Sequence, residues 1–141
     1  LMRRALILAT SLMLAPLHAW AADLVVEVVN LASNDGDVHV ALYDNPTTFP
    51  KSDGMLSERQ VLPNERRVRL VFHNLRPDMY AIAVYHDENG NHNFDQAIFG
   101  IPLEDYGFSN DVRVFFSAPS FAEAAFQVPD GGTVITIHLN D

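Results

Sequence analysis

The chain has 141 residues, contains no cysteine, and carries 9 Lys and Arg against 18 Asp and Glu, a net charge of −9. This length suits one domain with a single core, and the lack of cysteine excludes disulfides, thiol chemistry and thiolate metal sites. The acidic balance disfavours nucleic acid and anionic lipid as partners and favours cations.

The start of the chain has the features of a cleaved secretory signal peptide. Paired arginines at 3–4 precede an apolar stretch, 5–17, that is shorter than the roughly 20 residues of a membrane-spanning helix. The pattern Ala-Trp-Ala at 19–21 then offers a cleavage site, the alternative being an uncleaved anchor. We predict a signal peptide over 1–21 and one domain over 22–141, periplasmic or secreted, with no membrane insertion after cleavage. Cleavage leaves 7 basic and 18 acidic side chains, a net charge of −11.

Short runs in which apolar and polar residues alternate follow the leader, and this period is typical of half-buried β-strands. No run shows a helical period over three turns. We predict strands at 23–31, 37–44, 66–75, 80–87, 124–128 and 133–139. The alternation predicts the following core residues: Val38, Val40, Leu42, Val68, Leu70, Phe72, Tyr80, Ile82 and Val84.

These strands and turns predict an all-β fold, an antiparallel immunoglobulin-like or prealbumin-like β-sandwich of about seven strands. Tyr80 follows Leu75 and Pro77 just before a strand, where a corner tyrosine would bond back to the preceding backbone; ordinary core packing is the alternative. Two connections are too long for plain turns. The first, 45–55, has room for one short helical turn, and the second, 100–120, is long enough to carry function.

The segment HDENGNHNFD, 86–95, has oxygen-bearing side chains at alternate positions, as in a calcium-binding loop of the EF-hand type. His92 stands where such a loop has Gly, and Ile98 where it has a bidentate Glu that Glu104 or Asp105 would have to replace. The predicted calcium ligands are Asp87, Asn89, Asn91, Asn93, Asp95 and Glu104.

Two other interpretations of this loop stay open. Its side chains would bond to their own backbone in a solvated turn, or His86 and His92 would bind zinc with Asp87 or Asp95. The remaining histidines of the strands are expected on outward faces, solvated rather than bound to a ligand: His39, His73 and His138.

Within the second long connection, exposed aromatic rings next to amide and hydroxyl groups would resemble a sugar- or peptide-binding lip. The residues of this predicted lip are Tyr106, Phe108, Ser109 and Asn110. Alternatively, aromatic rings plug the end of the sandwich, namely Phe108, Phe115, Phe116 and Phe121.

No nucleophile motif such as Gly-x-Ser-x-Gly is present, so we predict that the protein is not an enzyme. A hydrolase would need a cleft lined by His86, Asp87, Glu104 and Ser109.

Three segments, 86–91, 100–110 and 119–126, resemble the secreted bacterial family known as domain of unknown function 2141, and the likeness covers nearly the whole mature chain. They are His-Asp-x-Asn-x-Asn, Gly-x-Pro-x-Glu continuing into Gly-Phe-Ser-Asn, and Pro-Ser-Phe-x-x-Ala-x-Phe. In that family the loop generally has Gly at the position of His92. The resemblance implies a small exported β-sandwich and no assigned reaction.

The sequence therefore predicts an exported, monomeric, non-catalytic β-sandwich whose acidic loop is stabilised by calcium. The alternative is an envelope module that binds a glycan or peptide through the loop 100–110.

Overall fold

The computed structural model describes residues 22–94, 102–114 and 117–139. The predicted signal peptide therefore lies outside the described residues, as do Asp95, Ile98, Phe115 and Phe116. In chain order the elements are β1 (Ala22–Val29), β2 (Asp37–Tyr43), η1 (Ser52–Gly54), β3 (Ser57–Val61), β4 (Val68–Leu75), β5 (Asp78–Asp87), β6 (Tyr106–Phe108), η3 (Ser109–Asp111), α1 (Phe121–Ala124), β7 (Phe126–Val128) and β8 (Thr133–His138). Among these residues no helix is long and apolar enough to cross a bilayer.

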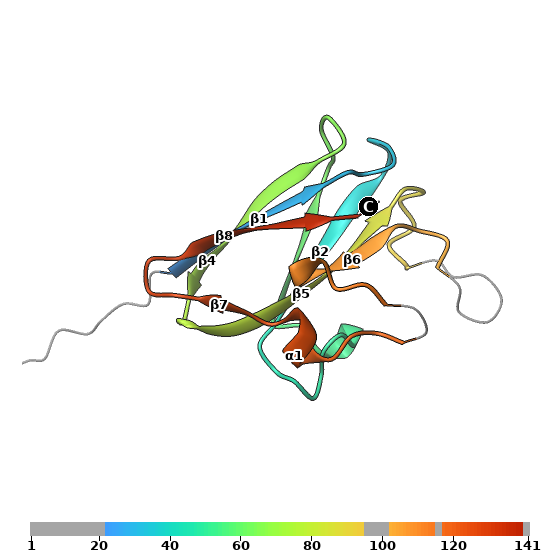
Figure 1. Ribbon diagram of the computed structural model, residues 1–141. Coiled ribbons are helices and arrows are strands. Elements are labelled where there is room, and N and C mark those ends of the chain that lie inside the picture. The colour runs from blue at the N-terminus through green and yellow to red at the C-terminus, as the bar shows by residue number, and fades with distance from the viewer. Residues whose placement is uncertain (1–21, 95–101, 115–116, 140–141) are drawn as a thin grey trace, which may run out of the picture.

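The strands form two sheets, which confirms the all-β fold (Figure 1). One sheet has the order β4-β1-β8 and the other the order β3-β2-β5-β6, with β7 pairing with β5 next to β6. The pairs are antiparallel except that β8 runs parallel to β1. Two strands, β3 and β6, fall in segments where the alternation predicted none, while η1 is the short turn expected in 45–55.

The core lies between the sheets and consists of the side chains on the inner faces of their strands. All nine predicted core residues are buried, so the alternation correctly identified the inward-facing side chains of these strands. The Tyr80 hydroxyl donates a hydrogen bond to the Arg76 carbonyl over 2.8 Å, as the corner-tyrosine prediction requires. Burial raises the pKa of Tyr80, since the phenolate is less well solvated there.

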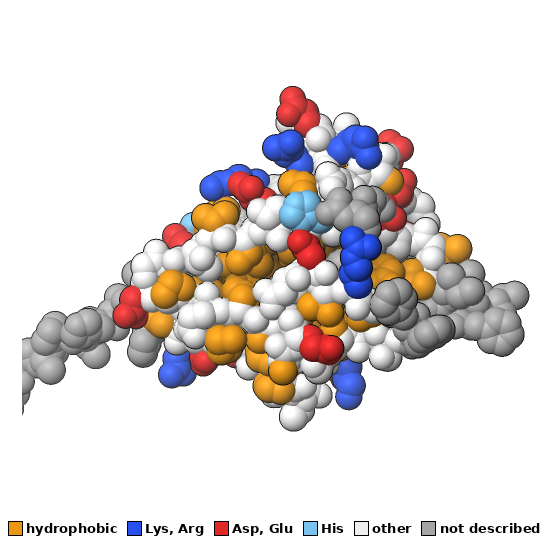
Figure 2. Space-filling model, viewed as in Figure 1, with side chains coloured by type: hydrophobic (Ala, Val, Ile, Leu, Met, Phe, Trp, Pro, Cys, Tyr) orange, Lys and Arg blue, Asp and Glu red, His pale blue; other side chains and the backbone are white. Residues whose placement is uncertain are grey.

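The outer face of the larger sheet is also covered, by the connections that follow β2 and β6. Phe49 packs its ring against Phe108 and Phe121, with centroids 6.0 Å apart in both pairs. The helix α1 lies beneath β5 (Figure 1), contacts η3 and begins with a capping box between Ser120 and Glu123. The space-filling view shows hydrophobic side chains around this region, whereas acidic side chains are spread over the face (Figure 2).

Candidate metal centre

Asp87 ends β5 and organises the acidic loop that follows. Its side chain is fully buried, and its carboxylate accepts the backbone N–H of Asn91 over 3.1 Å and that of His92 over 2.6 Å. Burial works to raise the pKa of Asp87, but hydrogen bonds from the N–H groups of His92, Asn91 and Gly90 outweigh it and hold that pKa below its ordinary value. Asp87 is therefore a buried carboxylate that stays ionised at neutral pH.

The alternate oxygens of the loop are engaged by its own backbone. Asn89 Oδ1 accepts the N–H of Asn91 over 3.0 Å, and Asn91 Oδ1 accepts the N–H of Asn93 over 2.8 Å. These bonds match the self-satisfied turn. Calcium binding by these oxygens stays a prediction. His92 has φ 61°, the left-handed conformation that an EF-hand-type loop requires at this position.

Asp37 and Asp87 are direct cross-strand partners at the end of the β2–β5 ladder. Their side chains share the outer face of the sheet, where like charges in opposite positions destabilise a strand pair. Gly36 allows the strands to meet here, because it has φ 63° and a Cβ would overlap the carbonyl oxygen of Asp87. Two carboxylates are thus held together at this sheet end.

His39 points from β2 onto the same face, two residues beyond Asp37. It is only 3% exposed, so the prediction that this imidazole is solvated was wrong. The ring of Tyr85 stacks on it at a centroid distance of 4.5 Å, and the acidic loop folds over it. His73 and His138 do lie at more accessible positions, with exposed fractions of 63% and 35%.

Glu58 on β3 sets the orientation and tautomer of His39. Its Oε1 lies 2.9 Å from Nδ1 of the imidazole. Since an ionised carboxylate only accepts hydrogen bonds, we assign the proton of the neutral ring to Nδ1, which leaves the lone pair on Nε2. A carboxylate that fixes a histidine in this way is the usual outer partner of a metal-binding imidazole.

The Nε2 atom of His39 is buried and has no hydrogen-bond partner among the described residues. It lies 3.3 Å from Asp37 Oδ2 and 3.7 Å from Asp87 Oδ2, and neither contact has the geometry of a hydrogen bond. A nitrogen lone pair facing two carboxylate oxygens is repulsive, and only a cation between them makes the arrangement favourable. The cation is either a proton on Nε2 or a metal ion.

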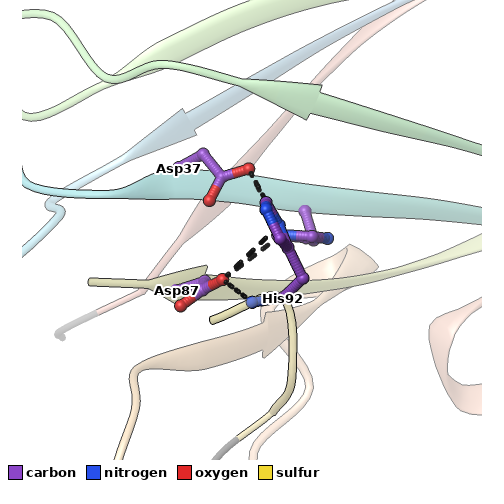
Figure 3. A group of neighbouring side chains, drawn as sticks. Asp37, Asp87 and His92 are labelled. Atoms are coloured by element: carbon purple, nitrogen blue, oxygen red, sulfur yellow. Dashed lines mark hydrogen bonds and ion pairs between the residues drawn. The ribbon is translucent and has the colours of Figure 1, made fainter. Parts of the chain in front are cut away.

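His92 completes a group of four donors, which we name the β2–β5 cluster: Asp37, His39, Asp87 and His92. Its Nδ1 lies 3.9 Å from Asp37 Oδ2 and 3.9 Å from Asp87 Oδ2, and the two carboxylates point toward its ring from neighbouring strands (Figure 3). All four donor atoms lie within 4.8 Å of one another. Zinc bond lengths near 2.1 Å put tetrahedral ligands about 3.4 Å apart. The four nitrogen–oxygen spacings, 3.3, 3.7, 3.9 and 3.9 Å, lie within about half an ångström of that value.

The chemistry of the donors favours a transition metal over calcium. Two imidazoles and two carboxylates suit zinc, whereas calcium requires six to eight oxygens. A divalent ion would also offset the charge of Asp37, Asp87 and the adjacent Glu58, of which the Asp87 side chain is fully buried. Glu104 is buried but belongs to neither group of His, Asp and Glu donors that converges in the described part of the chain.

The predicted binding lip is divided by the fold. Ser109 is fully buried, and Asn110 donates to the carbonyls of Glu123 and Ala125, so both hold η3 against α1. Tyr106 and Phe108 instead line a cavity of about 500 Å³ over the outer face of the larger sheet. His39 and His92 line the same cavity, which places the β2–β5 cluster in its wall.

The groups that a hydrolase would need do not form one cleft. His86 and Asp87 are consecutive strand residues, so their side chains point to opposite faces of the sheet. The Ser109 hydroxyl donates to the Ala124 carbonyl and accepts the N–H of Ile82, which occupies it structurally.

Sequence reasoning missed Asp37, His39 and Glu58. The spacing Asp-x-His in a strand does place two potential ligands on one face, and this signal was available. Their distance from the acidic loop along the chain hid the connection, because only strand pairing brings Asp37 opposite Asp87.

No curated protein and no solved structure matches the chain in the comparisons made. A family model described as "Uncharacterized protein conserved in bacteria (DUF2141)" matches residues 26–136, which is most of the chain. The resemblance of the acidic loop and the two segments after it is thereby confirmed, and the protein belongs to this bacterial family.

Proposed function

We propose that the protein is an exported, non-catalytic β-sandwich of immunoglobulin-like or prealbumin-like type that binds one zinc-class divalent ion at the β2–β5 cluster. The observation that carries the proposal is the buried Nε2 of His39, which lacks a hydrogen-bond partner and faces two carboxylates. Export is supported by the leader pattern of residues 1–21.

The ion would have a structural or regulatory role. Four protein donors complete a tetrahedron and leave no position for a reacting water, which is typical of structural zinc sites. Three donors lie on the sheet and the fourth, His92, on the loop, so the ion would pin the loop to the sheet. His92 is 63% exposed and offers the route by which the ion enters and leaves.

Calorimetric titration of chelator-stripped protein with Zn²⁺ and with Ca²⁺ tests the proposal. We expect Zn²⁺ to bind and His39→Gln to weaken binding by a hundredfold or more, while the matched control His73→Gln keeps wild-type affinity. Co²⁺ in the site should give the intense visible absorption of a tetrahedral ion. Wild-type affinity in His39→Gln would contradict the proposal.

Calcium remains the competing ion for the loop, and the same titration separates the two. If calcium is the ligand, Asn89→Ala and Asn91→Ala should weaken its binding and His39→Gln should not. If zinc is the ligand, the two asparagine variants should keep most of the affinity, because neither asparagine is one of the four donors of the β2–β5 cluster.

A second candidate function is binding of an envelope glycan or peptide in the cavity beside the cluster. A chain of aromatic rings lines it, with centroids 5.5 Å apart from Tyr85 to Phe94, 5.8 Å from Phe94 to Tyr106, and 6.0 Å from Tyr106 to Phe108. Rings beside polar groups suit the faces of sugars and apolar side chains. Phe94 follows His92 on the loop, so zinc would help to shape this wall.

Glycan and peptide arrays probed with and without zinc test this second function. A ligand of the cavity should be lost in Tyr106→Ala and retained in Asn110→Ala, because Asn110 bonds to the carbonyls beside α1 instead of lining the cavity. Equal loss in both variants would place the ligand elsewhere.

A further inference from the structure

A second cluster of donors lies at the same end of β5 but on the opposite face of the sheet. His86 is fully buried beside the inter-sheet core, one residue before Asp87. Glu88 and Asp105 bring carboxylate oxygens to within 4.8 Å of a ring nitrogen of His86 and of each other, and Glu88 Oε1 lies 4.0 Å from Nδ1. We name His86, Glu88 and Asp105 the inner cluster.

The hydrogen bonds of His86 direct a lone pair into this cluster. Its Nε2 lies 2.7 Å from the carbonyl oxygen of Asp35, and because a carbonyl only accepts, we assign the ring proton to Nε2. The neutral ring then has its lone pair on Nδ1, which is buried and has no hydrogen-bond partner among the described residues. A buried acceptor left unsatisfied is costly, so a cation at this position would stabilise the fold.

Hydrogen bonds to neighbouring segments hold the carboxylate of Glu88 and the backbone of Asp105. Glu88 Oε1 lies 4.0 Å from Nδ1 of His86, while its Oε2 accepts the hydroxyl of Ser33 over 3.2 Å. Ser33 is itself fixed, since its Oγ accepts the N–H of Asp35 over 3.1 Å. The backbone carbonyl of Asp105 accepts the N–H of His86 over 2.9 Å, which anchors the Asp105 segment beside the strand.

We propose that the inner cluster is a second divalent-cation site, independent of the β2–β5 cluster, with His86 Nδ1 and the carboxylates of Glu88 and Asp105 as ligands. One nitrogen and two oxygen donors suit a harder ion than the zinc-class ion of the β2–β5 cluster, and we assign Mn²⁺ to the inner cluster. Three protein ligands leave coordination positions for water, so this site is open where the four-donor cluster is closed. The ion would link the Ser33–Asp35 turn, β5 and the segment before β6.

The test is a Mn²⁺ titration of the chelator-stripped full chain, followed by the loss of the electron paramagnetic resonance signal of free Mn²⁺. We expect one Mn²⁺ to bind to the wild type and to His39→Gln. Glu88→Gln and Asp105→Asn should each weaken it by roughly tenfold or more, a loss typical of disturbed metal sites. Asp130→Asn, in the exposed turn between β7 and β8, is the matched control and should bind as the wild type does.

The outcomes separate this site from the zinc proposal. Mn²⁺ binding that Glu88→Gln and Asp105→Asn each weaken by roughly tenfold or more, with or without zinc binding at the β2–β5 cluster, supports the inner site. Absence of Mn²⁺ binding, or wild-type Mn²⁺ affinity in either of the two variants, overturns it. Binding that disappears only in His39→Gln also overturns it, because the ion would then occupy the β2–β5 cluster.

Discussion

The two faces of the larger sheet are buried by different means. On the inner face of β2, Val38, Val40 and Leu42 pack against the other sheet and are fully buried. On the outer face His39 and Tyr43 are 3% and 2% exposed, covered by loops and by short helical turns. The alternation of a strand thus identified the apolar face, whereas burial of the second face depended on segments distant in sequence.

The largest expected loss of stability comes from a substitution on the inner face of the larger sheet. Ile82→Ala removes a fully buried side chain between the sheets and should lower the free energy of unfolding by about 2–5 kcal/mol, with or without metal. Urea denaturation measures the loss. Val134→Ala is the control, because Val134 is 57% exposed on β8 and should change stability little. Equal stability of the two variants would contradict the assignment of Ile82 to the core.

The junction of the outer face with the acidic loop is the next most sensitive point. Gly36→Ala places a Cβ against the Asp87 carbonyl at a positive φ, and such strain costs about 1–3 kcal/mol. The added Cβ should also push Asp87 away from Asp37 and so weaken zinc binding, which calorimetry measures. Gly131→Ala, where a Cβ would meet open space, is the matched control. An unchanged zinc affinity in Gly36→Ala would show that zinc binding does not depend on the close approach of β2 and β5 at Gly36.

The corner tyrosine provides a smaller test on the inner face. Tyr80→Phe keeps the buried ring but removes the hydrogen bond to the Arg76 carbonyl, and the expected loss is about 1 kcal/mol. Thermal and urea denaturation at neutral pH measure it. A variant as stable as the wild type would mean that Tyr80 serves only as ordinary core.

The smallest effect concerns the cover of the outer face. Ser120→Ala removes the N-cap of α1, with an expected loss of about 0.5 kcal/mol at neutral pH. Hydrogen bonds from the backbone N–H and hydroxyl of Ser120 hold the pKa of Glu123 below its ordinary value of 4.5. The stabilisation by these bonds to the ionised Glu123 carboxylate is therefore present above about pH 4.5. It is lost as the pH falls through the pKa of Glu123 in the folded protein.

Denaturation of wild type and Ser120→Ala at pH 7 and at about pH 3 checks the sign. The stability difference should narrow at the lower pH, where Glu123 becomes protonated. A difference that widened there would show that the capping box is not the source of the shift.

Local patterns predicted local features of this protein well. Val68, Leu70 and Phe72 were recognised as core from their spacing, because successive side chains of a strand must point to opposite faces. The Tyr80 hydrogen bond spans four residues, and the left-handed His92 follows from a loop motif, so both were within reach of sequence reasoning. The capping box Ser120-x-x-Glu123 was equally readable and was missed because α1 is so short.

Pairing between distant segments lay beyond such patterns. The turn between β7 and β8 is plain in the sequence, yet β7 joins β5 and β8 joins β1 in parallel, so consecutive strands enter different sheets. Strand β3 carries Glu58 and Arg59 with little apolar alternation, because it lies at the edge of the larger sheet. Edge strands need less apolar surface, and their sequences signal them weakly.

The sequence by itself determined an acidic, cysteine-free, all-β domain and its inner core, since these depend on composition and on neighbours a few residues apart. Only the tertiary structure decided that Asp37 stands opposite Asp87, that Glu58 orients His39, and that His86 faces Asp105. Each of these relations depends on strand pairing or on a long loop closing over a sheet edge. A side chain acquires its electrostatic partners from that packing, because charges interact through space rather than along the chain.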